Sequence, residues 1–499
     1  MCAPLHTRNI YFLRKVNSMR EVSIMPATLT EQIPLPDGNL VAEALRAARA
    51  GFSRKIVVLD DDPTGIQTVH DIPVYTEWTE RTLEQALSEN GRMFFILTNS
   101  RGFTVEETEQ AHCQIAKNLA LASEKTGVPF LVLSRGDSTL RGHYPLETET
   151  VRKILEEKTA ICFDGEVIMP YFKEGGRLTI GDIHYVKAGE QLIPVGMTEF
   201  AKDTTFAYSS SDLKDWCEER TSGTYASSKI ISISLEELRN LDYDGMLKKL
   251  MPVHNFGKII VNAADDIDVE VFVTVLLRAL QSGKEFMFRC AAGLVRVLGN
   301  VDRRPLLTQT DLCPDISNFG GLVIVGSHVK KTTAQLEYLL NEEHTINSIC
   351  FDVETALEPN KLEQERDRVL KEAEESIRSG KTAIVYTSRK VLRLKKESTQ
   401  ENLKLSVHIS QALTSVVTLL SVRPRFIIAK GGITSSDVGT QALAVRRAWV
   451  MGQVAPGVPV WKTGKESKFP DLSYIIFPGN VGDVDTLQKV VHMLLDLDT

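Results

Sequence analysis

The sequence predicts an α/β protein of two domains, each a largely parallel sheet flanked by helices. Short apolar runs recur along the chain and end in glycine or small polar residues, as buried parallel strands do. Segments with helical spacing lie between these runs, which is the strand–helix–strand order of a parallel sheet. With 499 residues, the chain is also too long for a single hydrophobic core, so more than one domain is expected.

Composition and charge exclude several classes of protein. The chain is 43% hydrophobic and 25% charged, which is ordinary for a globular protein, and its net charge of −7 does not indicate a nucleic-acid or membrane surface. The best candidate for a membrane span, Ala412–Val422, is too short to cross a membrane. The seven cysteines are scattered and form no C-x-x-C pair, which argues against a zinc site and for reduced thiols. We therefore expect a cytoplasmic protein without nucleic-acid or membrane partners.

Residues 1–45 are interpreted as an N-terminal extension, extended or disordered. Arg8 and Arg14, with few early acids, also permit a transit peptide, and Met19 and Met25 are alternative initiators.

The first strand leads into an unusual acidic stretch. The apolar run Ile56–Leu59 is followed by Asp60–Asp62, and then by Pro63–Gly65, which cannot continue a strand. Ligands of open α/β sheets bind beyond the carboxyl ends of the strands. Three adjacent acids repel one another, so a metal ion, a proton to be removed or substrate hydroxyls should account for them. The alternative is a capped turn, with Asp62 or Thr64 as the cap.

Two further strands should end at the same edge. Met93–Leu97 leads into Asn99 and Arg101, and Phe130–Leu133 leads into the loop Arg135–Asp137. The segment Thr104–Lys125 between them has helical spacing and is predicted to be a crossover helix.

Acids and arginines side by side suit a small, hydroxylated, anionic substrate. Arginine binds a carboxylate through two hydrogen bonds, while aspartate accepts hydrogen bonds from hydroxyls. Structural salt bridges are the alternative. Downstream, Val167–Tyr185 has Gly175-Gly176 between two strand-like pieces and is predicted to be a hairpin or flap, in which His184 is structural.

A loop-like segment with two prolines, Arg303–Gly320, is the predicted domain boundary, which gives domains 46–305 and 321–499. The second domain should contain the strands Leu322–Val325, Ala383–Tyr386, Phe426–Ala429 and Tyr474–Phe477.

Three of these strands run into glycine-rich or small polar loops: Gly326-Ser327, Gly431–Ser435 and Pro478–Asp483. Backbone N–H groups in such loops, before a helix, form a phosphate cradle. Neither a Walker A motif nor G-x-G-x-x-G is present, so the predicted nucleotide site is of neither kind. Pro456–Val460 is interpreted as a rigid connection beside it.

The residues alone leave two alternatives of other classes open. Asp60-x-Asp62-x-Thr64 fits the opening motif of haloacid-dehalogenase-like phosphatases, with Asp265-Asp266 as metal-binding acids. A non-enzymatic sugar-acid sensor would need the first site without the second. The three glycine loops argue against the phosphatase, because a hydrolase does not need a second anion cradle.

Several longer motifs resemble the four-carbon acid sugar kinase family from about Lys55 onward: LDDDPTGIQTVHD, SRGDSTLRGHYPLE, PYFKEGGRLTI, KGGITSSD and FPGNVGD. The resemblance implies a sugar-acid-binding N-terminal domain, a nucleotide-binding C-terminal domain and an active-site cleft between them. It also implies phosphorylation of a tetronate or 3-oxo-tetronate at the C4 hydroxyl, with ATP and Mg²⁺. Which tetronate, which metal ligands and which oligomeric state remain open, although a homodimer is the default expectation.

Site residues carry over position by position. The resemblance implies Asp61 and Asp62 as catalytic residues, one of them accepting the C4 proton. Substrate binding is assigned to Asp60, Arg101, Arg135, Gly136, Asp137 and Ser138, with Arg101 and Arg135 clamping the carboxylate. ATP binding is assigned to Ser327, Gly431, Gly432, Ile433, Thr434, Gly479, Asn480, Val481 and Gly482. The chain departs from the family at Arg135, where lysine is common, and at Ile433, where glutamate is frequent.

Overall fold

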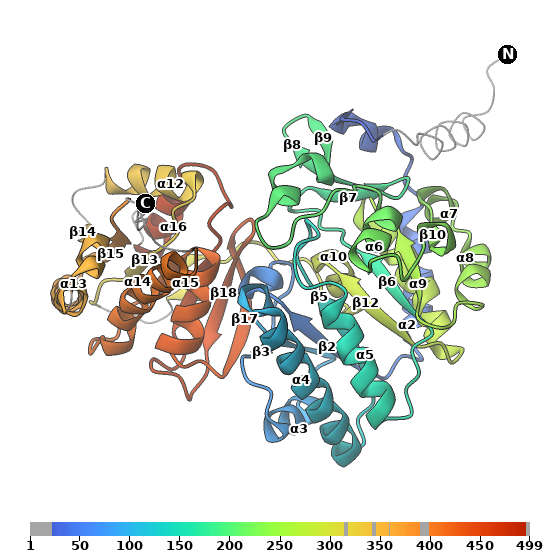
Figure 1. Ribbon diagram of the computed structural model, residues 1–499, viewed down its shortest axis with the longest axis horizontal. Coiled ribbons are helices and arrows are strands. Elements are labelled where there is room, and N and C mark those ends of the chain that lie inside the picture. Colours follow the sequence, from blue (N-terminus) through green and yellow to red (C-terminus); the bar gives the residue numbers. More distant parts are fainter. Residues whose placement is uncertain (1–21, 314–317, 342–345, 359, 390–398, 496–499) are drawn as a thin grey trace. The chain divides into compact units, whose positions relative to one another are not determined.

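The computed structural model describes residues 22–313, 318–341, 346–358, 360–389 and 399–495 (Figure 1). It divides into two compact units: one holds the chain up to Gly65 and Trp78–Asp302, the other Ile66–Glu77 and the chain from Arg303. Each unit contains a largely parallel sheet with helices beside it, so the predicted fold class is confirmed. The cleft between the domains stays a prediction.

The sheet of the first unit is parallel throughout. Its strand order is β10 (Ile231–Ile233), β11 (Gly257–Val261), β6 (Gly165–Met169), β12 (Phe286–Cys290), β5 (Phe130–Arg135), β2 (Lys55–Asp60) and β4 (Met93–Leu97). Every residue of β2, β4 and β5 is buried, which explains their continuous apolar runs. Asp60 is in register with Leu97 and Arg135. The three predicted strand ends therefore lie side by side.

Helices flank this sheet: α2 (Gly38–Arg49), α3 (Glu80–Ser88), α4 (Val105–Thr126), α5 (Leu146–Lys158), α6 (Leu213–Arg220), α7 (Leu235–Arg239), α8 (Tyr243–Leu250), α9 (Asp266–Gln281) and α10 (Ala292–Leu298). The predicted crossover helix is α4. It starts at a capping box between Thr104 and Glu107 and ends at Gly127, whose φ of +68° suits glycine.

A small antiparallel sheet has the order β1 (Met25–Pro26), β9 (Gln191–Pro194), β8 (Ile183–Ala188) and β7 (Arg177–Ile180). The predicted hairpin region contains two turns. Gly175-Gly176 lies in a turn closed by the antiparallel bridge between Phe172 and Arg177, as expected, and Gly181-Asp182 joins β7 to β8. We call the hairpin β7–β8 the flap. Gly181 and Asp182 have φ of +61° and +67°, as a two-residue turn between antiparallel strands requires. The second turn was not predicted, because the pair of glycines was the more conspicuous signal.

Part of the predicted N-terminal extension is regular structure. β1 pairs with β9, and α2 packs against α9. The expectation of an extended or disordered segment is therefore wrong for the helical residues Ala27–Gln32 and for α2, whereas β1 is extended. Met19 and the basic residues before it lie outside the described residues.

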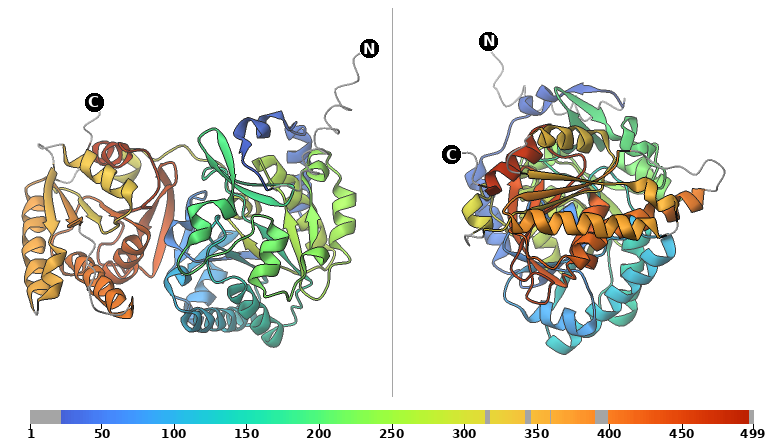
Figure 2. Two further views of the ribbon diagram at one scale, coloured as in Figure 1. Left: turned by 45° about the horizontal axis from the view of Figure 1, so that its top comes forward. Right: turned by 90° about the vertical axis from the view of Figure 1, so that its left-hand side faces the viewer.

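The second unit has a mixed sheet of order β3 (Ile72–Tyr75), β17 (Arg447–Ala455), β18 (Val458–Thr463), β19 (Ser473–Phe477), β16 (Ile427–Lys430), β13 (Leu322–Val325), β15 (Thr382–Thr387) and β14 (Ile346–Phe351). The last five strands are parallel, whereas β17 and β18 are antiparallel to their neighbours. Its helices are α11 (Gln309–Leu312), α12 (Lys330–Leu340), α13 (Lys361–Arg378), α14 (Thr399–Leu419), α15 (Gly432–Asp437) and α16 (Thr486–Leu495). Figure 2 shows helices flanking these strands.

Two segments differ from their predicted positions. Residues 66–77, assigned above to the first domain, belong to the second unit because β3 pairs with β17. The segment Pro456–Val460 is no rigid connection: Pro456-Gly457 forms the turn between β17 and β18, and the rest begins β18. A proline inside a strand hid this assignment.

Candidate functional site

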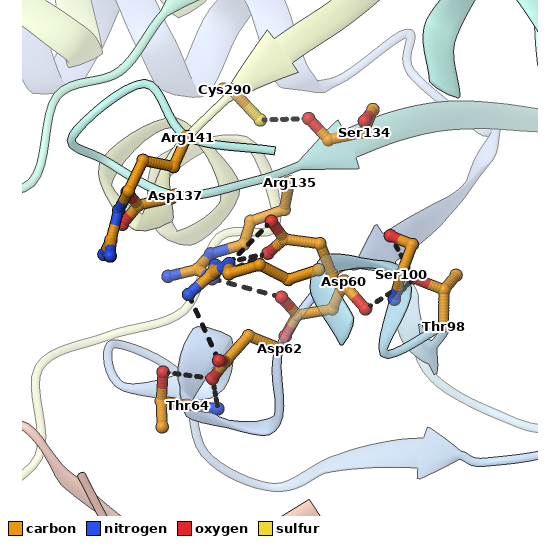
Figure 3. A network of polar contacts seen from close by, with 12 residues as sticks. Asp60, Asp62, Thr64, Thr98, Ser100, Ser134, Arg135, Asp137, Arg141 and Cys290 are labelled. Carbon is orange, nitrogen blue, oxygen red and sulfur yellow. Dashed lines mark hydrogen bonds and ion pairs between the residues drawn. The ribbon is translucent and has the colours of Figure 1, made fainter. Parts of the chain in front are cut away.

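One guanidinium binds two of the three adjacent carboxylates at the end of β2 (Figure 3). Arg101 donates from Nη2 to Asp61 Oδ1 at 2.7 Å and from Nε to Asp61 Oδ2 at 3.1 Å. Its Nη1 donates to Asp62 Oδ2 at 3.1 Å. Asn99, with a left-handed φ of +57°, turns the chain after β4 and starts the short helical turn that holds Arg101. The repulsion within the acidic stretch is therefore balanced mainly by this arginine.

Asp60 is the most deeply placed of the three acids. Its side chain is 1% exposed, and its Oδ1 accepts a hydrogen bond from Arg135 Nη1 at 3.2 Å, while Oδ2 has no partner. Gly65 packs directly on it, because a Cβ at position 65 would lie 2.0 Å from Asp60 Oδ1. Burial raises the pKa of Asp60 to about 7, against the opposing charge of Arg135.

The pKa values of Asp61 and Asp62 are shifted in opposite directions. Burial raises the pKa of Asp61, although the charge of Arg101 opposes it. Burial acts the same way on Asp62, but there the charge of Arg101 and two hydrogen bonds from Thr64 outweigh it and lower the pKa. Asp62 is also the most accessible of the three, with 16% of its side chain exposed. It caps the turn at residues 63–66 through the Thr64 N–H, so the capping alternative holds for this residue as well.

The loop after β5 holds a second ion pair. Arg141 Nε donates to Asp137 Oδ2 at 2.7 Å, and Thr139 donates its hydroxyl to the same oxygen. Although Asp137 is buried, the charges of Arg101 and Arg141 hold its pKa well below the usual range. The carbonyl of Ser138 accepts a hydrogen bond from His184 Nε2 at 2.8 Å, which agrees with the structural role expected for His184.

Two site residues were missed by the sequence reasoning. Glu147, at the start of α5, accepts a hydrogen bond from the Ser100 hydroxyl at 2.6 Å, and its Oε2 is buried without a partner. Arg289, in β12, covers Gly136 so closely that a Cβ there would lie 1.5 Å from Nη1. Asp61 Oδ2, Arg289 Nη2 and Glu147 Oε2 lie 3.4, 3.6 and 4.0 Å from the position a Cβ would take at Gly142. A charged residue inside the apolar run Phe286–Cys290 was the available signal for Arg289.

In the second unit, the three glycine-containing loops converge on Ser327. A Cβ at Gly431 would lie 2.8 Å from Ser327 Cβ, and one at Gly479 would lie 3.0 Å from Ser327 Oγ. Thr332 Oγ1 joins the first and third loops by donating to the Gly479 carbonyl at 2.8 Å. Gly431 has φ of +122°, which favours glycine. Of the predicted cradle residues, Ser327, Gly431 and Gly479 are thus brought together at the carboxyl ends of β13, β16 and β19.

Two buried side chains hold these loops in place. Gln335 donates from Nε2 to the carbonyls of Val481 and Asp483 at 3.0 and 2.6 Å. Lys430, at the end of β16, donates to the Pro478 carbonyl at 2.6 Å and lies 3.9 Å from the centre of the Phe477 ring. Burial lowers the pKa of Lys430 to about 7. Neither residue was a sequence candidate.

The other residues predicted to contact the nucleotide are not all close to Ser327. Ile433 is 71% exposed, and Thr434 is buried, with its Oγ1 2.3 Å from where a Cβ would stand at Gly326. Asn480 is exposed, whereas the backbone of Val481 is held by Gln335. Gly482 has φ of +82° before the start of α16.

The phosphatase alternative is weakened by the surroundings of its acids. Its proposed nucleophile, Asp60, is 1% exposed and packed under Gly65. Asp265 caps α9, while Asp266 pairs with Arg296 at 2.9 Å. Within the described part of the chain, no group of three or more His, Cys, Asp or Glu side chains could hold a metal ion. No described helix is long and apolar enough to cross a membrane.

Comparison with family models finds two domains in this order. Residues 56–298 match a sugar-binding N-terminal domain, and residues 322–487 match a nucleotide-binding C-terminal domain. A comparison with curated proteins gives no match.

Two solved structures share the fold. Haemophilus influenzae protein HI1011 is 18% identical with a TM-score of 0.56, and the match covers 88% of this chain and all of that one. A putative tRNA synthase from Salmonella typhimurium LT2 is 16% identical with a TM-score of 0.60, covering 86% of this chain and 97% of that one. At these identities the likeness concerns the fold alone, whereas the two domain models carry the family assignment. The chain belongs to the family of four-carbon acid sugar kinases, whose sugar-binding and nucleotide-binding domains it contains.

Proposed function

We propose that this protein is a kinase that uses ATP to phosphorylate a four-carbon acid sugar, a tetronate or 3-oxo-tetronate, at the C4 hydroxyl. The observation that carries the proposal is the pairing of two chemically different sites. The sugar-binding domain has acids and arginines at one sheet edge. The nucleotide-binding domain has three glycine-containing loops converging on one serine.

The glycine loops suit the phosphates of ATP. Side chains at Gly431 or Gly479 would meet Ser327, so only bare backbone leaves room for phosphate oxygens to approach the N–H groups. Within the described residues no group of three or more His, Cys, Asp or Glu side chains could hold a metal ion, so Mg²⁺ would take most of its ligands from the phosphates and water, with at most one or two carboxylates. When bound, Mg²⁺ neutralises charge on the phosphoryl group during transfer.

Among the three adjacent acids, Asp62 is the best candidate for the base. A base must touch the attacking hydroxyl, and Asp60 and Asp61 are only 1% and 2% exposed, against 16% for Asp62. Its lowered pKa keeps Asp62 ionised at neutral pH. Asp60 and Asp61 then act by holding Arg135 and Arg101, which orient the site.

The substitution Asp62→Asn tests this assignment. It removes the proton acceptor and keeps the shape of the side chain, so kcat should fall about a hundredfold or more. ADP affinity, measured by calorimetry, should be unchanged, because Asp62 belongs to the sugar-binding domain. The matched control is Asp244→Asn, at an exposed position in α8. An equal loss of ADP affinity in Asp62→Asn would refute the assignment of Asp62 to the sugar site.

The class of reaction is tested by ADP release with ATP–Mg²⁺ and a panel of tetronates and 3-oxo-tetronates. Strong turnover of one acid supports the kinase and identifies its substrate. Phosphate release from a phosphorylated sugar acid, without ADP formation, would instead support the phosphatase. Binding of an acid without either reaction would support the sensor.

A further inference from the structure

The arginines expected to clamp the substrate carboxylate are already engaged. Arg101 uses Nε, Nη1 and Nη2 on Asp61 and Asp62. The side chain of Arg135 is 5% exposed and bound to Asp60. A carboxylate arriving from solution would have to displace a buried acid to reach either one, which leaves that acid unpaired at high cost.

Arg177, the first residue of the flap, is in a different situation. Its guanidinium carbon lies 5.6 Å from the centre of the Phe200 ring, and no acid within the described residues lies close enough for an ion pair. Its Nε is buried without a hydrogen-bond partner. Burial lowers the pKa of Arg177, whereas the charge of Asp137 opposes this effect. The cation is thus partly desolvated and incompletely paired.

Neighbouring groups keep Arg177 in this state. The acid whose charge acts on it, Asp137, is bound at 2.7 Å by Arg141, which itself lies 5.1 Å from the Phe200 ring centre. Two arginines therefore lie near the Phe200 ring, and of these only Arg141 has a carboxylate partner. A Cβ at Gly175 would lie 2.4 Å from the Phe172 ring and 3.1 Å from Arg177 Nη1, so glycine there lets the backbone approach both side chains.

The flap is fixed to the predicted substrate loop. His184 receives a hydrogen bond from the Thr179 hydroxyl at 2.9 Å and donates to the Ser138 carbonyl at 2.8 Å. Burial lowers the pKa of His184 to about 4, so its ring is neutral and makes both contacts at physiological pH. Thr179 also pairs with Ala263, two residues beyond the end of β11. Arg177 is consequently held in place beside the loop Asp137–Thr139 rather than carried on a free hairpin.

From this geometry we propose that Arg177 on the flap, beside the Phe200 ring, binds the carboxylate of the four-carbon acid and selects acids over neutral polyols. The inference rests on the proposed function for its substrate class. A carboxylate would complete both the charge and the hydrogen bonding of Arg177, and two parallel hydrogen bonds would fix its direction. The hydroxyls would then lie toward Asp137 and the three adjacent acids.

The test compares Arg177→Met and Arg177→Lys with the control Lys187→Met, an exposed position on β8. Calorimetry with erythronate and threonate, without ATP, measures binding of the acids. Erythritol and threitol serve as neutral four-carbon competitors. Loss of a charge-assisted contact should weaken binding of the acid about 10- to 100-fold in Arg177→Met. The affinity of Arg177→Lys for the acid should lie between those of the wild type and Arg177→Met. Lys187→Met should bind the acid like the wild type, and the affinity for the neutral polyols should be the same in all variants.

Binding and turnover separate this proposal from the proposed kinase activity. If the acids bind to the wild type but not to Arg177→Met, the proposed carboxylate site is supported even when no ADP is formed. If Arg177→Met phosphorylates tetronates with an unchanged KM, the kinase activity is supported and the carboxylate site at Arg177 is refuted. An equal loss of acid and polyol binding in Arg177→Lys would show a structural role only. Failure of the wild type to bind any of the acids would overturn the inference.

Discussion

Asp60 offers a quantitative test of the site's electrostatics. Its pKa rises from 3.8 to about 7 because its carboxyl group is buried, with one oxygen unpaired. Between these two values the unfolded chain releases a proton that the native protein keeps. Native Asp60 therefore contributes stability that is fully present below about pH 4 and is lost as pH rises to about 7. The difference of about 3 pKa units corresponds to about 4 kcal/mol at 1.36 kcal/mol per unit.

Asp60→Asn removes this titration and keeps the shape of the side chain against Gly65. The variant loses the ion pair with Arg135, so its absolute stability is not diagnostic, whereas its pH dependence is. Relative to Asp60→Asn, the wild type should lose about 1.4 kcal/mol of unfolding free energy for each pH unit between about 4 and 7. Above pH 7 the difference should be constant.

Urea unfolding at a series of pH values measures this difference. Other acids with raised pKa values, such as Asp61, titrate in both proteins, so their effects largely cancel. Asp244→Asn, at an exposed position in α8, is measured in parallel as the control. A wild type that gains stability relative to Asp60→Asn over this pH range would refute the burial argument, because it would mean that Arg135 dominates and lowers the pKa.

Two further predictions concern the nucleotide-binding domain. In Gly479→Ala, the new Cβ would lie 3.0 Å from Ser327 Oγ and 3.3 Å from Val329, so ADP affinity should fall about tenfold by calorimetry. Gly38→Ala, where nothing lies within 4 Å, should bind ADP normally, and equal losses in both would refute the cradle. Lys430 is charged below its pKa of about 7 and neutral above it, so ADP affinity should weaken from about pH 6 to 8 more in the wild type than in Lys430→Met. The titration of ADP itself affects its binding to both proteins equally. Parallel curves of ADP affinity against pH for the wild type and Lys430→Met would therefore contradict a role for the Lys430 charge.

Much of the fold could be predicted because its signals are local. The apolar runs at β2, β4 and β13 are continuous because both faces of these strands are buried. Each strand could therefore be predicted from its apolar run alone. The crossover helix α4 carries its own start and stop residues. Once these elements are known to be parallel, their carboxyl ends must lie at one edge. That rule alone brings Asp60–Asp62, Arg101 and Arg135 together.

What the tertiary structure decided is the pairing and the burial of these groups. The sequence could not show that Arg101 binds Asp61 and Asp62, or that Arg289 and Glu147, from distant segments, complete the cluster. Three adjacent aspartates look alike in a sequence, yet their pKa values diverge because desolvation and nearby charge depend on three-dimensional surroundings. Local patterns thus determine which residues reach the site, whereas long-range packing determines which of them remain free to bind a ligand.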